Sequence, residues 1–238
     1  MKRLVVAMGF LTRLPLPQVA ADTDDFAAAI RLYPLVGLII GVIIAGAAWL
    51  GALIDPWTGA LAALAGWVAI TGALHLDGLA DLADGLGAAH GNRERLLAVM
   101  ADPHVGSFGA TALALQLIAK LVLLHAAAPL GWWPLMLVPF AARIGPLAWS
   151  AWLPPLKVGG LATLVAGAVR RRDLIGWTLL CAAAAAIAPA LLATPVLIGG
   201  WGWWLRARLG GVTGDAHGAG IELVETGLLL ALAIAAHR

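Results

Sequence analysis

The chain has 238 residues, of which 62% are hydrophobic and 12% are charged, and its formal net charge is +2. A soluble domain of this size could not cover so much apolar surface, and repeated apolar segments of roughly 20 residues indicate a helical membrane protein. The small charge argues against nucleic-acid binding, the long apolar runs argue against a transmembrane barrel, and a single cysteine, Cys181, excludes an internal disulfide or a CxxC site.

The N-terminal 20 residues contain a short apolar stretch between Arg3 and Pro15, flanked by basic side chains. This stretch is too short to span a bilayer, so we expect a helix that lies at the lipid headgroups and is ended by Pro15 and Pro17. Residues 21–26, with the sequence ADTDDF, are predicted to form a polar loop.

Seven apolar segments follow, and they predict an all-α polytopic membrane protein with about seven transmembrane helices in a single domain, residues 1–238. The candidate spans are residues 31–54, 57–75, 106–127, 132–153, 173–192, 195–209 and about 217–236. Pro189 and Pro195 interrupt the fifth and sixth segments, so these two could instead form one long broken helix, which would give six spans.

The basic residues favour seven spans with a cytoplasmic N-terminus, because nearly all loop Lys and Arg then lie on the cytoplasmic side and Arg238 is the exception. Six spans would put Arg206 and Arg208 on the wrong side. The loops that would face the cytoplasm also contain most of the unusual polar residues, so we expect the active site there. These loops are residues 76–105, 154–172 and 209–218.

The stretch LDGLADLADGL, residues 76–86, places three aspartates at the end of an apolar span. Asp77, Asp81 and Asp84 are spaced by four and then three residues, so a helix would carry them on one face. Unpaired carboxylates near lipid are costly, and a divalent cation would remove their repulsion, since hard carboxylate oxygens select Mg²⁺ or Mn²⁺. The pattern predicts a magnesium site, although any one of these aspartates could be an ordinary loop or capping residue.

A second polar stretch, GGVTGDAHGAGIELVE, covers residues 210–225. Asp215 would begin the last helix, with Glu222 two turns later on the same face. One interpretation is a second acidic patch that completes the metal and substrate site. The other is an N-cap at Thr213 or Asp215, with close helix packing through the glycines.

Basic residues supply candidates for binding a diphosphate. Arg93 and Arg95 open an amphipathic stretch, where contact with lipid headgroups is the alternative role. Lys120 and Arg143 lie inside predicted spans and could pair with carboxylates or hold phosphate oxygens; Lys120 could also snorkel to the interface.

The span that begins near Gly106, Ser107 and Gly109 should present free N–H groups, which suit an anion or a simple N-cap. His75 and His104 are weak candidates for a general base.

These motifs occur together in one known family. The chain resembles cobalamin synthase, also called adenosylcobinamide-GDP ribazoletransferase, through stretches that run in order over nearly its whole length. They are FLTRLPLP (10–17), YPLVGLIIG (33–41), HLDGLADLADGL (75–86), RERLLAVMADPHVGSFG (93–109), LIAKL (117–121), AARIGP (141–146) and GGVTGDAHGAGIELVE (210–225). Two departures are His104, where the family pattern has an arginine, and His217, where an apolar residue is usual.

The resemblance implies an enzyme of vitamin B12 biosynthesis in the bacterial inner membrane. It would join adenosylcobinamide-GDP to α-ribazole, or to its 5′-phosphate, and release GMP with Mg²⁺ as cofactor. The implied partners are these small molecules and membrane lipid, with no nucleic acid and with a homo-oligomer left open.

On this basis the metal ligands are Asp77, Asp81 and Asp84, with Asp215 favoured over Asp102 as the fourth. These three first aspartates and His104 form the catalytic set. The substrate-binding candidates are Arg93, Arg95, Asp102, Lys120, Arg143 and Glu222.

Two other functions compete with this assignment. A lipid synthase similar to CDP-alcohol phosphotransferases would use a related arrangement of aspartates, but the longer pattern of that family is absent. An ion-coupled transporter should show inverted repeats and polar residues reachable from both faces, and neither is evident. No GxxxxGK[ST] loop is present, which argues against an ATP-driven pump.

Overall fold

The computed structural model describes residues 1–157 and 160–238, which are helical apart from loops and one isolated bridge between Pro155 and Val212. The predicted all-α class is confirmed. The α-helices are α1 (Lys2–Leu11), α2 (Thr23–Ala29), α3 (Tyr33–Gly51), α4 (Pro56–Thr71), α5 (Leu74–Ala89), α6 (Arg93–Val99), α7 (Ser107–Ala127), α8 (Leu137–Ala142), α9 (Ile144–Trp152), α10 (Leu161–Val165), α11 (Arg171–Ala184), α12 (Thr194–Arg208) and α13 (Gly214–Ala236). Four 3₁₀ helices join them, namely η1 (Ile30–Leu32), η2 (Ala128–Leu130), η3 (Trp133–Met136) and η4 (Pro189–Ala193).

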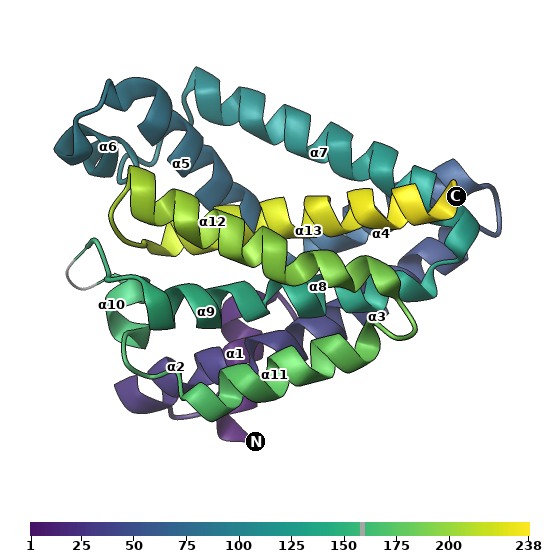
Figure 1. The fold of residues 1–238 in the computed structure, drawn as a ribbon, viewed down its shortest axis with the longest axis horizontal. Helices are drawn as coiled ribbons and strands as arrows, with labels where there is room; N and C mark the ends of the chain where they lie inside the picture. The colour runs from purple at the N-terminus through teal and green to yellow at the C-terminus, as the bar shows by residue number, and fades with distance from the viewer. Residues whose placement is uncertain (158–159) are drawn as a thin grey trace.

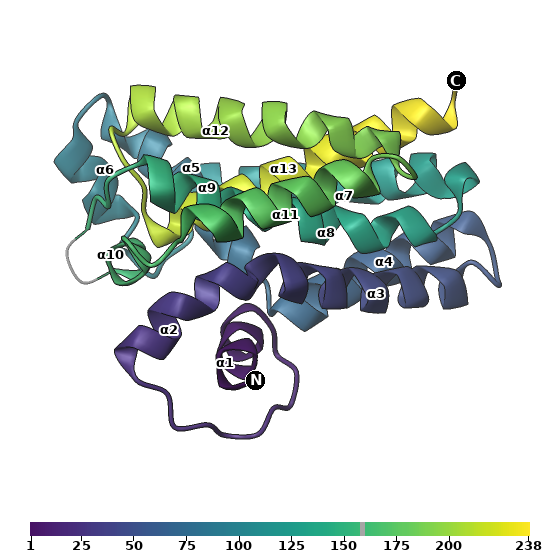
Figure 2. The ribbon, with the colours of Figure 1, turned by 60° about the horizontal axis from the view of Figure 1, so that its bottom comes forward.

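The N-terminal helix α1 lies across the long helices, and Figure 2 shows it nearly end-on. This orientation fits the predicted interfacial helix. Its last residue is Leu11, ahead of the prolines, because the chain at Thr12 becomes extended and the Thr12 hydroxyl donates to the Met8 carbonyl at 2.7 Å.

The predicted polar loop at residues 21–26 is wrong, since α2 begins at Thr23. The Asp22 carboxylate accepts a hydrogen bond from the Asp25 N–H at 2.7 Å and so caps this helix. Asp24 and Asp25 in the first turn also suit the positive end of the helix dipole. Asp25 in turn forms ion pairs with Lys2 and Arg3, which join α2 to α1.

Three described helical stretches are long and apolar enough to cross a membrane, which supports the predicted membrane class. They are Thr23–Gly51, Ser107–Leu130 and Gly214–Ala236, and α4 with α5 would make a fourth if this bent pair is one span. The other predicted spans contain shorter helices. The fourth span is divided into α8 and α9 at Arg143, and α12 has 15 residues, about 22 Å, against a hydrocarbon core of about 30 Å. Seven crossings therefore stay a prediction.

The fifth and sixth predicted spans do not merge into one helix. α11 and α12 run in opposite directions along the long axis of the molecule, and the connection through η4 turns the chain back (Figure 1). The reversal agrees with the layout that was predicted from the positive charges of Arg206 and Arg208.

The polar loops gather at one end of the molecule, on the left in Figure 1. This end carries α2, α6, α10, the end of α5 and the connection from α12 to α13, whereas the connections from α3 to α4 and from α7 to η3 lie at the other end. The predicted loop 154–172 also belongs to the polar end, although its residues 158 and 159 lie outside the described ranges. One end of the fold therefore holds most of the candidate site residues.

Glycines of α3 allow close packing against η3 and α8. A Cβ atom added at Gly41 would lie 2.7 Å from the Met136 Cα atom, whereas a Cβ atom at Gly46, on the same helix, would meet nothing within 4 Å. We expect Gly41→Ala to lower the free energy of unfolding by about 1–3 kcal/mol through overpacking. Gly46→Ala should be neutral or stabilising by up to about 1 kcal/mol. Unfolding in mixed micelles, followed by circular dichroism, measures both, and equal effects would contradict the packing explanation.

Candidate active site at the acidic helix

The acidic helix α5 turns away from α4 at a sharp corner. Gly72 and Ala73 both have φ of +59°, in the left-handed region, and the two helices are bent by 85°. An alanine in this conformation costs roughly 1–2 kcal/mol, so the surrounding packing enforces the turn. Asp77, Asp81 and Asp84 thus lie on one helix, as predicted, but on a separate helix rather than at the end of a span.

Helix α5 packs closely on the start of α13 through glycines. A Cβ atom at Gly78 would lie 2.8 Å from the Asp215 carbonyl oxygen, and one at Gly218 would lie 3.3 Å from His75. This close approach places Asp215 near enough for its charge to act on Asp81, as the charge of Asp77 also does. The predicted close packing through the glycines is confirmed, and it brings two acidic stretches together.

Lys157 is the cation beside this acidic cluster, which we define as Asp77, Asp81 and Asp215. Its Nζ atom lies 3.7 Å from an Asp215 carboxylate oxygen. The preceding loop is held by strand-like pairing: the Leu156 N–H donates to the Val212 carbonyl at 3.0 Å, and the Val212 N–H donates to the Pro154 carbonyl at 2.9 Å. Sequence reasoning missed Lys157, because a single lysine in a loop carries no periodic signal.

Thr213 caps α13, since its hydroxyl accepts from the Ala216 N–H at 3.1 Å. The N-cap interpretation is therefore correct for Thr213. The Asp215 carboxylate remains at the surface of α13, half-buried and facing Lys157.

Asp84 has a different environment from the other two aspartates of α5. Its two carboxylate oxygens accept from the Gly106 N–H at 2.7 Å and from the Gly109 N–H at 2.8 Å, and the side chain is buried. The predicted anion site at the start of α7 is thus filled by the protein's own carboxylate. Asp84 joins α5 to α7, whereas Asp77 is exposed to solvent.

The acidic cluster has the donor chemistry for a hard divalent cation. Its three carboxylates come from two packed helices, and Lys157 supplies one compensating positive charge. Within residues 1–157 and 160–238, however, no group of three or more His, Cys, Asp or Glu side chains is already arranged closely enough to hold a metal ion. The donor types fit magnesium, and ligation would draw these carboxylates together.

The two intramembrane cations are paired with glutamates. The Lys120 Nζ atom lies 2.7 Å from a carboxylate oxygen of both Glu222 and Glu225, and Arg143 Nη1 lies 2.8 Å from Glu225. Lys120 and Arg143 are 2% and 0% exposed. The pairing interpretation is correct and snorkelling of Lys120 is wrong. Because Lys120 and Arg143 are buried and neutralised, the structure argues against their predicted contact with a diphosphate. Glu222 is buried against Lys120, which argues against its predicted place in a metal and substrate site.

This buried network continues to the start of the acidic helix. The Gln116 side-chain amide donates to Glu222 at 2.7 Å, and Arg143 Nη2 lies 3.2 Å from His75 Nε2. His75 is therefore a buried partner of Arg143, which removes it as a general base. Gln116 and Glu225 were missed, although their spacing from Lys120 and Glu222, four and three residues within apolar spans, was an available signal.

Comparison with known proteins decides the family. The family model described as cobalamin-5-phosphate synthase matches residues 3–233. The chain belongs to this family.

Relatives named adenosylcobinamide-GDP ribazoletransferase match it over nearly their full length. The protein of Novosphingobium aromaticivorans is 58% identical, covering 98% of this chain and 97% of its own. That of Laribacter hongkongensis is 53% identical over 100% and 98%, and that of Thiobacillus denitrificans is 48% identical over 97% and 94%. No solved structure matches the chain.

In this member of the cobalamin-5-phosphate synthase family, the remaining predicted site residues lie on exposed segments at the polar end. The His104 side chain is 89% exposed, and its ring Nδ1 lies 2.7 Å from Asp102. The His104 N–H also donates to Asp102, and these two hydrogen bonds lower the pKa of that carboxyl below its usual value. Arg93 and Arg95 are exposed on α6, and Arg93 lies beside Gly210 in the connection to α13. Their predicted roles with substrate stay predictions.

Proposed function

We propose that this protein is an adenosylcobinamide-GDP ribazoletransferase, which joins adenosylcobinamide-GDP to α-ribazole or α-ribazole 5′-phosphate and releases GMP. The observation that carries this proposal is the match of the family model and of the named relatives over nearly the whole chain. The acidic helix, with its partner Asp215 at an exposed end of a membrane protein, supplies suitable chemistry.

The reaction is a transfer at phosphorus. The ribazole 3′-hydroxyl oxygen forms a bond to the phosphorus nearest the cobinamide, and the bond from that phosphorus to the GMP oxygen breaks. GMP leaves with the bonding electrons, and the hydroxyl proton passes to a base. Among the described groups, the exposed His104 and the carboxylates of the acidic cluster remain as acceptors, since His75 is buried against Arg143.

We propose Asp77, Asp81 and Asp215 as the residues that hold Mg²⁺. When bound, this ion would neutralise phosphate oxygens and stabilise the leaving group. The three carboxylates carry more negative charge than the single lysine beside them, Lys157, can neutralise, and this imbalance supports the assignment of a cation site. Asp84 becomes a positioning residue, because each of its oxygens already accepts an N–H of α7 and so fixes the orientation of α5.

Other residues of the chain bind the nucleotide or hold the acidic cluster in position. Arg93 and Arg95 on α6 are the proposed contacts for the nucleotide, because they are exposed at the same end as the acidic cluster and carry no ion pair within the described ranges. Gly78 fixes the separation of α5 and α13, since any larger residue would push Asp215 away.

A membrane-fraction assay tests the reaction. With adenosylcobinamide-GDP, α-ribazole and Mg²⁺, we expect GMP release that a chelator abolishes and added Mg²⁺ restores. Replacing the first substrate with CDP-diacylglycerol should give no CMP, and CMP release would favour the lipid-synthase alternative. GMP release that is insensitive to chelator would contradict the metal assignment, and its complete absence would contradict the proposed function.

We also propose that the protein lies in the inner membrane with the acidic cluster facing the cytoplasm. The gathering of basic residues at the polar end supports this orientation. Labelling with an impermeant maleimide should reach Glu94→Cys only in opened spheroplasts, and Leu53→Cys, at the other end, in intact ones. Both positions are exposed, and the native Cys181 is buried. The reverse labelling pattern would refute the orientation.

A further inference from the structure

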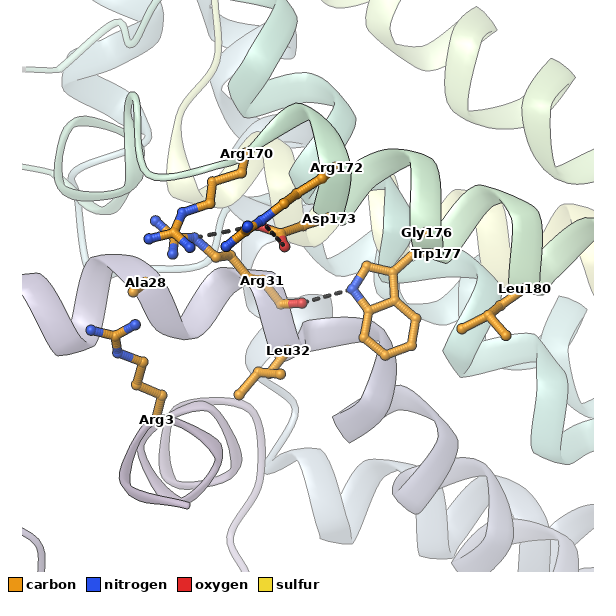
Figure 3. Close-up of a pocket in the computed structure, with 10 residues that line it drawn as sticks. All are labelled: Arg3, Ala28, Arg31, Leu32, Arg170, Arg172, Asp173, Gly176, Trp177 and Leu180. Atoms are coloured by element: carbon orange, nitrogen blue, oxygen red, sulfur yellow. Dashed lines mark hydrogen bonds and ion pairs between the residues drawn. The ribbon is translucent and has the colours of Figure 1, made fainter.

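A pocket of about 410 Å³ lies where α1, η1 and the start of α11 meet. Figure 3 shows its lining, with Arg3 from α1, Arg31 from η1, and Arg170 and Arg172 from the beginning of α11. The acidic cluster contributes no residue to this pocket, and the proposed reaction does not use it.

The pocket is strongly basic. Four guanidinium groups line it together with one carboxylate, Asp173, which lies 3.6 Å from Arg31 Nε and 3.9 Å from Arg172 Nε. Arg3 is shared with Asp25, at 3.2 Å, outside the pocket lining. The charges of Arg170, Arg3 and Arg172 all act on Arg31, so positive charge at this position is only partly compensated.

One of the four cations, Arg31, is held in place before any ligand binds. Arg31 Nε donates to the Ala168 carbonyl at 2.6 Å, and the Arg31 carbonyl accepts from Trp177 Nε1 at 2.8 Å. The first bond ties the Arg31 side chain to the segment that precedes α11, and the second ties η1 to α11 itself. At the start of α11 no side chain caps the helix within the described residues, so its free N–H groups add to the positive potential.

The other half of the pocket is apolar. Leu32, Trp177 and Leu180 line it, and Leu180 is 55% exposed on the outer surface of α11. The preceding residue, Leu179, is 64% exposed. The expected interfacial helix, α1, lies beside the pocket and contributes Arg3 to its lining. A basic half at the polar end and an apolar half toward the bundle match a molecule with an anionic head and hydrocarbon chains.

We propose that this pocket binds the phosphate of an anionic glycerophospholipid, with the arginines on the phosphate and the apolar residues on its acyl chains. Gly176 lines the pocket, and a Cβ atom there would meet nothing within 4 Å, so this residue leaves open space that a larger side chain would fill. A free phosphate would use the same arginines but not the apolar half.

Native mass spectrometry of delipidated protein, titrated with phosphatidylglycerol or phosphatidylcholine, tests the site. We expect tighter binding of phosphatidylglycerol. Arg170→Gln with Arg172→Gln should weaken it at least about tenfold, since each arginine near a membrane surface contributes roughly fivefold. The matched pair Arg206→Gln with Arg208→Gln removes the same charge at the end of α12 and should change nothing.

Gly176→Leu provides a second variant that keeps all the charges and blocks the space, and it should also weaken phosphatidylglycerol binding. Equal binding of the two lipids, equal effects of the two arginine pairs, or unchanged binding by Gly176→Leu would each overturn the proposal. Displacement of phosphatidylglycerol by inorganic phosphate at comparable concentration would assign the arginines to a free phosphate and overturn the lipid assignment.

Discussion

Replacing Asp81 with asparagine is expected to lower GMP release by at least about a hundredfold, equivalent to about 2.7 kcal/mol of transition-state stabilisation, while the protein still inserts and purifies folded. The charges of Asp77 and Asp215 both act on Asp81, so a neutral amide there removes a hard donor from the acidic cluster. The loss of one repelling charge should leave stability unchanged or slightly higher. GMP release and circular dichroism of the purified variant measure the two effects.

Asp22→Asn is the matched control for this variant. Asp22 caps α2 outside the acidic cluster, and asparagine caps helices about as well as aspartate. We expect its turnover to equal that of the unmodified protein. Normal GMP release by Asp81→Asn would contradict the metal assignment. An equal loss of GMP release in both variants would show that the effect is not specific to the acidic cluster.

The second large effect is expected in the buried network of Lys120, Arg143, Glu222 and Glu225, whose two cations and two carboxylates balance. Arg143→Met leaves two carboxylates against Lys120 and removes the partner of His75. Breaking a buried ion pair from one side typically costs about 3–5 kcal/mol. We expect a loss of this size in the free energy of unfolding in mixed micelles.

The double variant Arg143→Met with Glu225→Gln makes the test specific, because it restores charge balance. The remaining Lys120 and Glu222 still pair at 2.7 Å. We expect the double variant to be more stable than Arg143→Met alone, with a coupling energy of at least about 1 kcal/mol. Arg206→Met, at an exposed position, should stay within about 0.5 kcal/mol. Additive losses in the double variant would contradict the charge-balance explanation.

Much of the candidate site was readable in local spacing. The four-then-three spacing of Asp77, Asp81 and Asp84 predicted one helix, and one of the two interpretations of residues 210–225 placed an N-cap at Thr213 or Asp215, of which the structure has Thr213. Both signals depend on residues within two turns of each other, where helix geometry alone sets the distances. The loop prediction for residues 21–26 was wrong although the signal was equally local. The run of polar residues suggested a loop, but Asp22 is the N-cap of α2.

Composition and local pattern determined the membrane class, the helical fold and the acidic helix, while the ordered motifs carried the resemblance to the family that the comparisons confirmed. Tertiary structure decided which charges compensate each other. Arg143 meets Glu225 across 82 residues, Lys120 meets the same glutamate across 105, and Asp84 reaches the start of α7 across 22. At low dielectric, a charge is stable only beside its partner. That partner is chosen by how helices pack and where loops such as the one carrying Lys157 return, and neither follows from spacing along the chain.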